Sequence, residues 1–523
     1  MKTRKMMLTV SSAVMLVSAG AAATDWEALN ASSLEQSLAV VAPGEPGKQP
    51  FWNGSSKAFI HPPAFEFTGG TAFTLTDSSS KKVAEWTAKR PIDPIPSEVW
   101  KGLKPGHYTV SNGTCKRRFY RAAVFEGPYA PAARSYADAV SRCDEAVFKT
   151  QYVQGWLKPG APKAIVYDLY SYPSKIMGAL IGYLADYSKA SADRRDQAIE
   201  IAKKMADWLI ANRQPAGSPL QYFTPTYSLE ACANPRGEAR KYAGNHMMIY
   251  PAEAACNFLK LHDALAENDP DRAKYFDAAL KIALQYAAMQ EADGTWAIVY
   301  READGSKFSQ QRFIPEGWIF GLLDDLIKRL NSESAEHRRL VAVRKAAFDY
   351  VDKSIRPAFL WNGQFEDATI KPDYVNLQHG NAITFALQLF RVGRTEDACA
   401  LVDWCEDQFV VWSAPCPDGI DFQTWRTPTA LEQYDYYTAI DGSMCMMIKG
   451  FLAAYEATGK ALYLEKARAL ADNLTRGQRP DGTIPTYFSN RRGSDWINCM
   501  LSSREVLSRM SKYDDRGRGK RPN

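Results

Sequence analysis

Residues 272–300 read RAKYFDAALKIALQYAAMQEADGTWAIVY, and this stretch predicts the repeating unit of the fold. In residues 272–290 apolar side chains recur at three- and four-residue spacing, as on one face of an α-helix. Asp293-Gly294, a dipeptide typical of turns, comes next, and a segment carrying Trp296 and Tyr300 follows it. The stretch therefore predicts a helix that ends in a turn and an aromatic segment.

The same order of features recurs along the chain. Helical spacing also marks residues 174–190, 194–214, 251–267 and 463–478. Comparable turn-and-aromatic segments occupy residues 214–223, 361–367, 416–425 and 478–488. We interpret this as a weak internal repeat of helical hairpins. It predicts a mainly α protein with an (α/α) toroid of about six or seven hairpins. An open solenoid is the alternative, and the long, irregular, aromatic loops favour the toroid, in which they would line a cleft.

The region ahead of the helices has a different texture. Residues 71–77 (TAFTLTD) alternate apolar and polar side chains, and residues 81–90 (KKVAEWTAKR) follow, with Pro and Gly between such segments. We expect a small β-sandwich-like N-terminal domain over residues 24–128, followed by the toroid over residues 129–510.

The two ends of the chain carry their own signals. Lys2, Arg4 and Lys5 precede an apolar run, and Ala21-Ala22-Ala23 forms a cleavage pattern, so residues 1–23 are predicted to be a signal peptide. A periplasmic or secreted protein follows from this. No later apolar run approaches the ~20 residues of a membrane span. Residues 511–523 are predicted to be a basic, disordered tail.

Composition narrows the classes of partner. A hydrophobic content of 46% with 12% aromatic residues indicates a globular protein with many rings that can stack on sugars. The formal net charge of +5 includes the three cations of the leader, and +2 remains without them. Such a balance gives no argument for nucleic acid, so an anion site must be a local cluster. The nine cysteines contain no CxxC pair, and no metal or cofactor is predicted.

Gly244-Asn245-His246 stands just ahead of a predicted helix. Together with a β-domain joined to a helical toroid, this motif resembles the toroidal polysaccharide lyases that act on uronic-acid polymers, such as alginate and glucuronan lyases. The resemblance implies β-elimination on an anionic polysaccharide, without a metal. Such an enzyme must neutralise the C6 carboxylate, remove the C5 proton and assist departure of the 4-oxygen.

The resemblance also implies catalytic residues. Asn245 and His246 would face the carboxylate; in the alternative interpretation Asn245 caps a helix and His246 is a buried, satisfied histidine. Tyr300 follows at a family-like interval and would transfer the proton. Arg312 resembles the family's arginine, although Ile319 stands where that pattern has its tyrosine. A single Tyr suits mannuronate- or glucuronate-type polymers, whose C5 proton and 4-oxygen lie on the same side of the ring.

Further polar and aromatic residues are candidates for substrate binding. They are His379 at another helix start, the cluster Tyr434, Tyr436 and Tyr437, and the pair Arg491 and Arg492, which could hold a carboxylate. A helix-start role, packing in the toroid and a solvated surface are the respective structural alternatives.

Other functions compete with the lyase. A glycoside hydrolase on the same toroid, such as an unsaturated-uronyl hydrolase, would need a carboxyl acid/base. The available carboxyl groups are Glu316, Asp367, Asp435 and Asp441. A uronyl C5-epimerase and a non-catalytic glycan-binding protein are the further alternatives.

Overall fold

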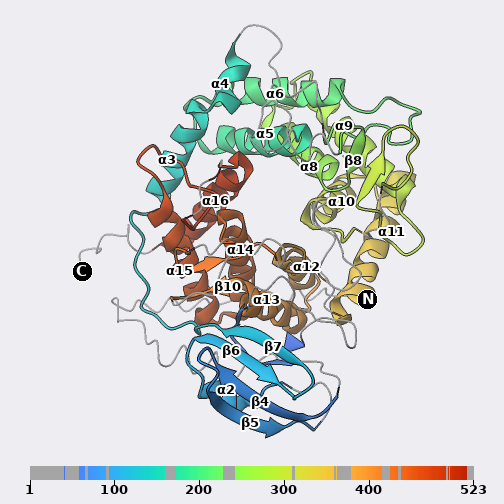
Figure 1. The fold of residues 1–523 in the computed structure, drawn as a ribbon. Coiled ribbons are helices and arrows are strands. Elements are labelled where there is room, and N and C mark those ends of the chain that lie inside the picture. The colour runs from blue at the N-terminus through green and yellow to red at the C-terminus, as the bar shows by residue number, and fades with distance from the viewer. Residues whose placement is uncertain are drawn as a thin grey trace, which may run out of the picture.

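The protein is a ring of helices with a small sheet beside it (Figure 1). The structure is a computed structural model. It describes residues 40–41, 58–64, 69–89, 94–158, 172–227, 242–308, 313–358, 361, 378–414, 424–433, 438–490, 493 and 495–514. The predicted leader and residues 515–523 of the predicted tail lie outside this description. The mainly α toroid predicted from the sequence is confirmed.

Six helices of the described chain form the inner wall of the ring. They are α5 (Pro173–Ala190), α8 (Tyr250–Ala264), α10 (Gly317–Arg329), α12 (His379–Arg391), α14 (Asp441–Thr458) and α16 (Ile497–Met510). Each packs against the next, and α16 packs against α5, so the ring is closed. Helices such as α12 are buried around most of their circumference, which is expected of helices with neighbours on every side.

Six further helices form the outer wall. They are α3 (Tyr136–Lys149), α6 (Arg195–Ala211), α9 (Arg272–Met289), α11 (Ala335–Tyr350), α13 (Thr395–Phe409) and α15 (Ala461–Gly477). Helix α9 buries one stripe, which includes Tyr275, Ile282 and Tyr286 at the predicted spacing, whereas α13 and α15 are buried on more than one side. The short helices are α2 (Ser97–Lys101), α4 (Gln151–Leu157), η1 (Val351–Ile355), η2 (Arg356–Ala358) and η4 (Ser511–Tyr513). None of the described helices has the length and apolar character needed to cross a membrane.

The connections at the two ends of the ring differ in length. Where an inner helix passes to the next outer helix, the links are short: residues 191–194, 265–271, 330–334, 392–394 and 459–460. Where an outer helix passes to the next inner helix, they are long: residues 150–172, which include α4, and residues 212–249, 290–316, 359–378, 410–440 and 478–496. The long connections hold the small strands β8 (Asn245–Met247), β9 (Val299–Arg301), β10 (Val410–Val411) and β11 (Thr429–Ala430). The inner helices therefore all begin at the end of the ring that the long connections occupy.

The turn after α9 shows how the repeat is built. The side-chain amide of Gln290 donates to the carbonyl oxygens of Gly294 and of Val343 in α11, at 2.9 Å each. Gly294 has a φ of 93°, a conformation that favours glycine. The turn thus fastens one outer helix to the next.

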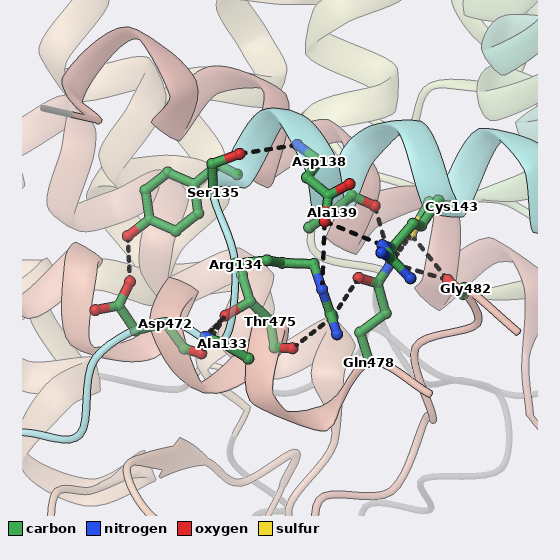
Figure 2. A network of polar contacts seen from close by, with 12 residues as sticks. Ala133, Arg134, Ser135, Asp138, Ala139, Cys143, Asp472, Thr475, Gln478 and Gly482 are labelled. Carbon is green, nitrogen blue, oxygen red and sulfur yellow. Dashed lines mark hydrogen bonds and ion pairs between the residues drawn. The ribbon is translucent and has the colours of Figure 1, made fainter. Parts of the chain in front are cut away.

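The same turn follows α15 and closes the ring (Figure 2). There the Gln478 amide donates to Gly482 O at 2.9 Å and to Ala139 O of α3 at 2.8 Å. Arg134, just before α3, donates to the Gln478 side-chain oxygen at 2.7 Å and to Thr475 O at 3.0 Å. The first and last parts of the ring are therefore joined by the same device that joins its middle.

A five-stranded sheet lies beside the ring. Its strand order is β2 (Ala58–Phe59), β7 (Lys116–Arg121), β6 (Gly106–Ser111), β4 (Ala72–Asp77) and β5 (Lys82–Thr87). All neighbours are antiparallel except β2 and β7. A separate parallel pair joins β1 (Val40–Val41) and β3 (Pro63–Ala64).

The larger sheet packs against helices. Trp100 of α2 stacks on Phe119 of β7 at 5.7 Å between ring centroids, and β2 lies against α13. Beside β2, His61 Nδ1 lies 2.9 Å from the buried Asp407 carboxylate of α13. The β-rich N-terminal region predicted from the sequence is confirmed, and its described strands form this five-stranded sheet and the separate β1–β3 pair.

Candidate active site

The first turns of the inner helices gather polar side chains at the long-loop end of the ring. Lys175 lies in the first turn of α5, Glu253 in that of α8, and Asp441 begins α14. Glu316 holds the N-cap position of α10, and His379 begins α12. Because helix N-termini carry partial positive charge, this end of the ring is a favourable place for groups that become anionic.

Glu253 stands out among these residues. Glu253 is only 7% exposed. Within the described chain its carboxyl group makes no hydrogen bond or ion pair. Burial raises the pKa of Glu253 to about 8, and the positive charge of Lys175 opposes that rise. At neutral pH the group is therefore mostly a carboxylic acid with a proton to give.

Lys175 lies beside Glu253 on the neighbouring helix. Its Nζ is 5.3 Å from the ring centroid of Tyr172 and 5.3 Å from that of Tyr250, and these two buried rings are 5.3 Å apart. Ammonium groups over tyrosine faces are attracted by the ring electrons. The two rings therefore fix a cation between α5 and α8.

Asp441 is a second buried carboxyl group at this end. Its oxygens accept hydrogen bonds from Ser503 Oγ at 2.9 Å and from the Gly442 amide at 2.8 Å. Burial raises its pKa well above the usual value. Because its partners belong to α14 itself and to α16, Asp441 joins two inner helices.

Glu432 supplies a half-buried carboxyl group from the connection between α13 and α14. The charges of Asp441 and Glu432 raise the pKa of the Cys499 thiol of α16, and the charge of Lys175 lowers it. Lys175 acts on Glu253 as well. Glu432 therefore shares with Lys175 an influence on the Cys499 thiol, and Lys175 in turn acts on Glu253.

The residues that the lyase resemblance singled out are brought together on two strands. In the β8–β9 pair, His246 stands opposite Tyr300 and Asn245 opposite Arg301. His246 is fully buried, with Nε2 3.0 Å from Thr224 O and Nδ1 3.0 Å from Glu302 Oε1. Since both contacted atoms are acceptors, the imidazole holds two long connections against each other.

The polar ends of Asn245 and Tyr300 also have partners within the loops. The Asn245 amide donates to the carbonyl oxygens of Tyr242 and Ala243, at 3.1 Å each. The N-cap of α8 is Ile249, so Asn245 does not cap that helix. The Tyr300 hydroxyl accepts from the Ala297 amide at 2.9 Å and lies 3.2 Å from the Glu291 carboxylate. A catalytic role for these residues stays a prediction.

His379 joins the loop before α14 to the inner wall. Its ring nitrogens lie 3.2 Å from Glu432 O and 3.3 Å from Ser443 O. Burial lowers the pKa of His379 to about 4, so the ring is neutral at physiological pH. Its predicted role in substrate binding is not tested by these contacts.

Several predicted site residues lie outside the described residues. They are Arg312, Tyr434, Tyr436, Tyr437, Arg491 and Arg492, together with the hydrolase candidates Asp367 and Asp435. Within the described chain, no group of His, Cys, Asp and Glu side chains has the arrangement of a metal site.

Comparison with known proteins places the fold. No protein-family model matches the chain, and no curated protein matches it by sequence. Among solved structures, the cellobiose 2-epimerase from Spirochaeta thermophila DSM 6192 matches with a TM-score of 0.50 and 12% identity, over 72% of this chain and 98% of that chain. This likeness supports the toroid.

Two further solved structures match with lower TM-scores. A sugar epimerase from a ruminal bacterium matches with a TM-score of 0.48 and 10% identity, over 71% of this chain and 98% of the other. A family 76 glycoside hydrolase from a bovine Bacteroides thetaiotaomicron strain matches with a TM-score of 0.44 and 11% identity, over 84% and 93%.

The prediction of a polysaccharide lyase is wrong. The matched proteins are described as epimerases and glycoside hydrolases. The motif that suggested a lyase, Asn245-His246 with Tyr300, has a local explanation, because these side chains make hydrogen bonds within the long connections. The sequence reasoning also missed Glu253. Its signal was the single charged residue in the first turns of a helix, YPAEAACNFL at residues 250–259.

Proposed function

We propose that the protein is a glycoside hydrolase in which Glu253 is the general acid. The observation that carries the proposal is a buried carboxyl group without a partner in the described chain, protonated at neutral pH, in the first turn of an inner helix. Cleavage of a glycosidic bond needs an acid that keeps its proton until the leaving oxygen takes it. Burial, which raises the pKa of Glu253, supplies that property.

Glu432 is the proposed second carboxyl group. Glycosidases pair the acid with a carboxylate that activates water or attacks the sugar. Glu432 is half-buried on a long connection. Like Lys175, it affects the pKa of the Cys499 thiol of α16. In the proposed reaction Glu253 gives its proton to the glycosidic oxygen, the C–O bond breaks with its electron pair on that oxygen, and water completes the cleavage.

The substrate class is a glycan. Solved structures similar to this chain include a cellobiose 2-epimerase and a family 76 glycoside hydrolase, which supports action on sugars. We keep two sequence-based expectations as part of the proposal: an anionic, uronate-bearing oligosaccharide or polysaccharide as substrate, and export of the protein by its leader.

Sugar epimerisation is the second candidate. A group that removes a proton from carbon and returns it works best when its pKa lies near the working pH. Because the pKa of Glu253 is about 8, the same side chain can act in both directions. The two candidates differ in their products and agree on the residue.

The test compares Glu253→Gln with the wild type on neutral and uronate-containing oligosaccharides. New reducing ends report hydrolysis, and proton NMR of the sugar reports epimerisation. The matched control is Glu267→Gln, an exposed residue in the short link after α8. We expect wild type and Glu267→Gln to cleave a member of the panel and Glu253→Gln to lose this activity. Cleavage by Glu253→Gln at the wild-type rate would refute the assignment, and binding of a glycan without turnover would show a binding protein instead.

A further inference from the structure

Lys175 has a setting that the proposed reaction does not yet use. Its ammonium group is held 5.3 Å from the centroids of both Tyr172 and Tyr250, where the first turns of α5 and α8 meet. Both rings are buried, so they cannot move aside easily. The cation is therefore placed by packing and has little freedom to leave.

The helix geometry connects this cation with the acid. Tyr250 and Glu253 are three residues apart on α8, and residues with this spacing share a helix face. A cation that sits on Tyr250 therefore lies on the side of α8 that carries Glu253. In agreement with this placement, Lys175 is the charge that counteracts burial in setting the pKa of Glu253.

We propose that Lys175 is a positioning residue for Glu253: fixed between two tyrosine rings, its ammonium group stabilises the carboxylate that remains after Glu253 has given up its proton. The role deepens the proposed function and rests on it, since it matters when Glu253 cycles between acid and anion. The proton leaves Glu253 for the glycosidic oxygen and is restored from water at the end of the cycle, so no other reactant is needed.

The other titratable groups considered around Glu253 do not supply the positive charge that would stabilise its carboxylate. On α8 itself, burial raises the pKa of Cys256, and on α9 burial raises that of Tyr286, so both stay neutral. Glu316, at the start of α10, carries a carboxyl group rather than a cation, and its charge raises the pKa of Tyr286. Lys260, near the other end of α8, pairs with Asp186 at 2.9 Å.

A spectroscopic titration tests the coupling without relying on activity. The infrared carbonyl band of the protonated Glu253 side chain is identified as the band lost in Glu253→Gln, and its disappearance is followed as pH rises. In Lys175→Met, with Lys175→Gln as the second variant, we expect the proton affinity of Glu253 to increase on the order of tenfold. Lys175→Arg keeps the charge and should stay near wild type. Lys189→Met, on an exposed position in the last turn of the same helix, is the matched control and should change nothing.

The outcomes separate the two proposals. An unchanged titration in folded Lys175→Met and Lys175→Gln would overturn the role of Lys175, even if Glu253→Gln is inactive. A shifted titration together with a fully active Glu253→Gln would overturn the proposed function and leave the coupling intact. If both proposals hold, the pH profile of kcat shifts in the same direction as the infrared titration, which a purely structural lysine would not produce.

Discussion

Glu253 and Asp441 are both carboxyl groups in the first turns of inner helices, and burial raises the pKa of both. They differ in their partners. Asp441 accepts from Ser503 Oγ and from the Gly442 amide, whereas the Glu253 carboxyl group has no partner in the described chain. A buried polar group with satisfied hydrogen bonds stabilises a fold, and one without them costs stability. We infer from the difference that burial without hydrogen-bond partners, rather than burial alone, distinguishes the proposed acid.

The largest expected effect is on turnover. Glu253→Gln replaces a protonated acid by an amide of the same shape that cannot transfer a proton. We expect kcat to fall by about 10²-fold or more, the range of general acid catalysis. Asp441→Asn, the matched change at the satisfied site, should lower kcat much less. Equal losses in the two variants, measured on the same substrate, would erase the proposed distinction.

The second effect is on stability, where the change at Asp441 should have the larger effect and the change at Glu253 the smaller one. Asp441→Ala leaves the Ser503 hydroxyl and the Gly442 amide without their acceptor, so we expect it to lower the free energy of unfolding by about 2–4 kcal/mol. Glu253→Ala leaves no described hydrogen-bond partner unsatisfied and should lower the free energy of unfolding by less. Thermal unfolding at pH 6 measures both, and a less stable Glu253→Ala would contradict the comparison.

The third effect is a pH dependence of stability. Because burial raises the pKa of Glu253 from 4.5 to about 8, the folded state binds more protons than the unfolded state between these values. The stability linked to this proton is complete below about pH 4.5 and is lost as pH rises towards 8, at up to about 1.4 kcal/mol per pH unit. Glu253→Gln should remove this decline. Unfolding free energies of both proteins at pH 5, 6.5 and 8 provide the check, and parallel curves would argue against a raised pKa.

The smallest effect concerns the Ser503 hydroxyl, which donates to Asp441 and also lies 3.4 Å from Cys445 Sγ. Ser503→Ala removes a donor to Asp441, and we expect a loss of about 1 kcal/mol in the free energy of unfolding. Ser502→Ala, at the preceding position of α16, removes a half-buried hydroxyl that donates to Asn498 O of the same helix. Its effect should be smaller. A loss in Ser502→Ala that equals that in Ser503→Ala would show that Asp441 gains nothing from its partner.

Local patterns were enough to predict the toroid. Apolar spacing within residues 272–290 identified α9, and Asp293-Gly294 identified the turn where φ is positive. Both signals depend on neighbours along the chain, which a sequence displays directly. The pairing of Gln290 with α11, by contrast, joins residues distant in sequence.

The chemistry was harder to predict for the same reason. Asn245-His246 looks alike in a sequence whether the imidazole meets a substrate or, as here, Thr224 O and Glu302. Glu253 looks like any helical glutamate until its burial is known and no described residue is found to bond its carboxyl group. The pKa of a side chain depends on what the tertiary structure removes from water and on which charges it brings close, and neither quantity is local.

The joint between α3 and the turn after α15 has a consequence for how the chain folds. Contacts such as Cys143 Sγ to Gly482 O join residues 339 positions apart, so the entropy of closing a very long loop must be offset before they form. During synthesis, α5 emerges long before α16, the helix that completes its inner wall. The nascent chain therefore carries an open arc of apolar helices until its last helix is made. Ring closure is thus a late step in folding, and the apolar edges of the unfinished arc are the surfaces that a chaperone would shield.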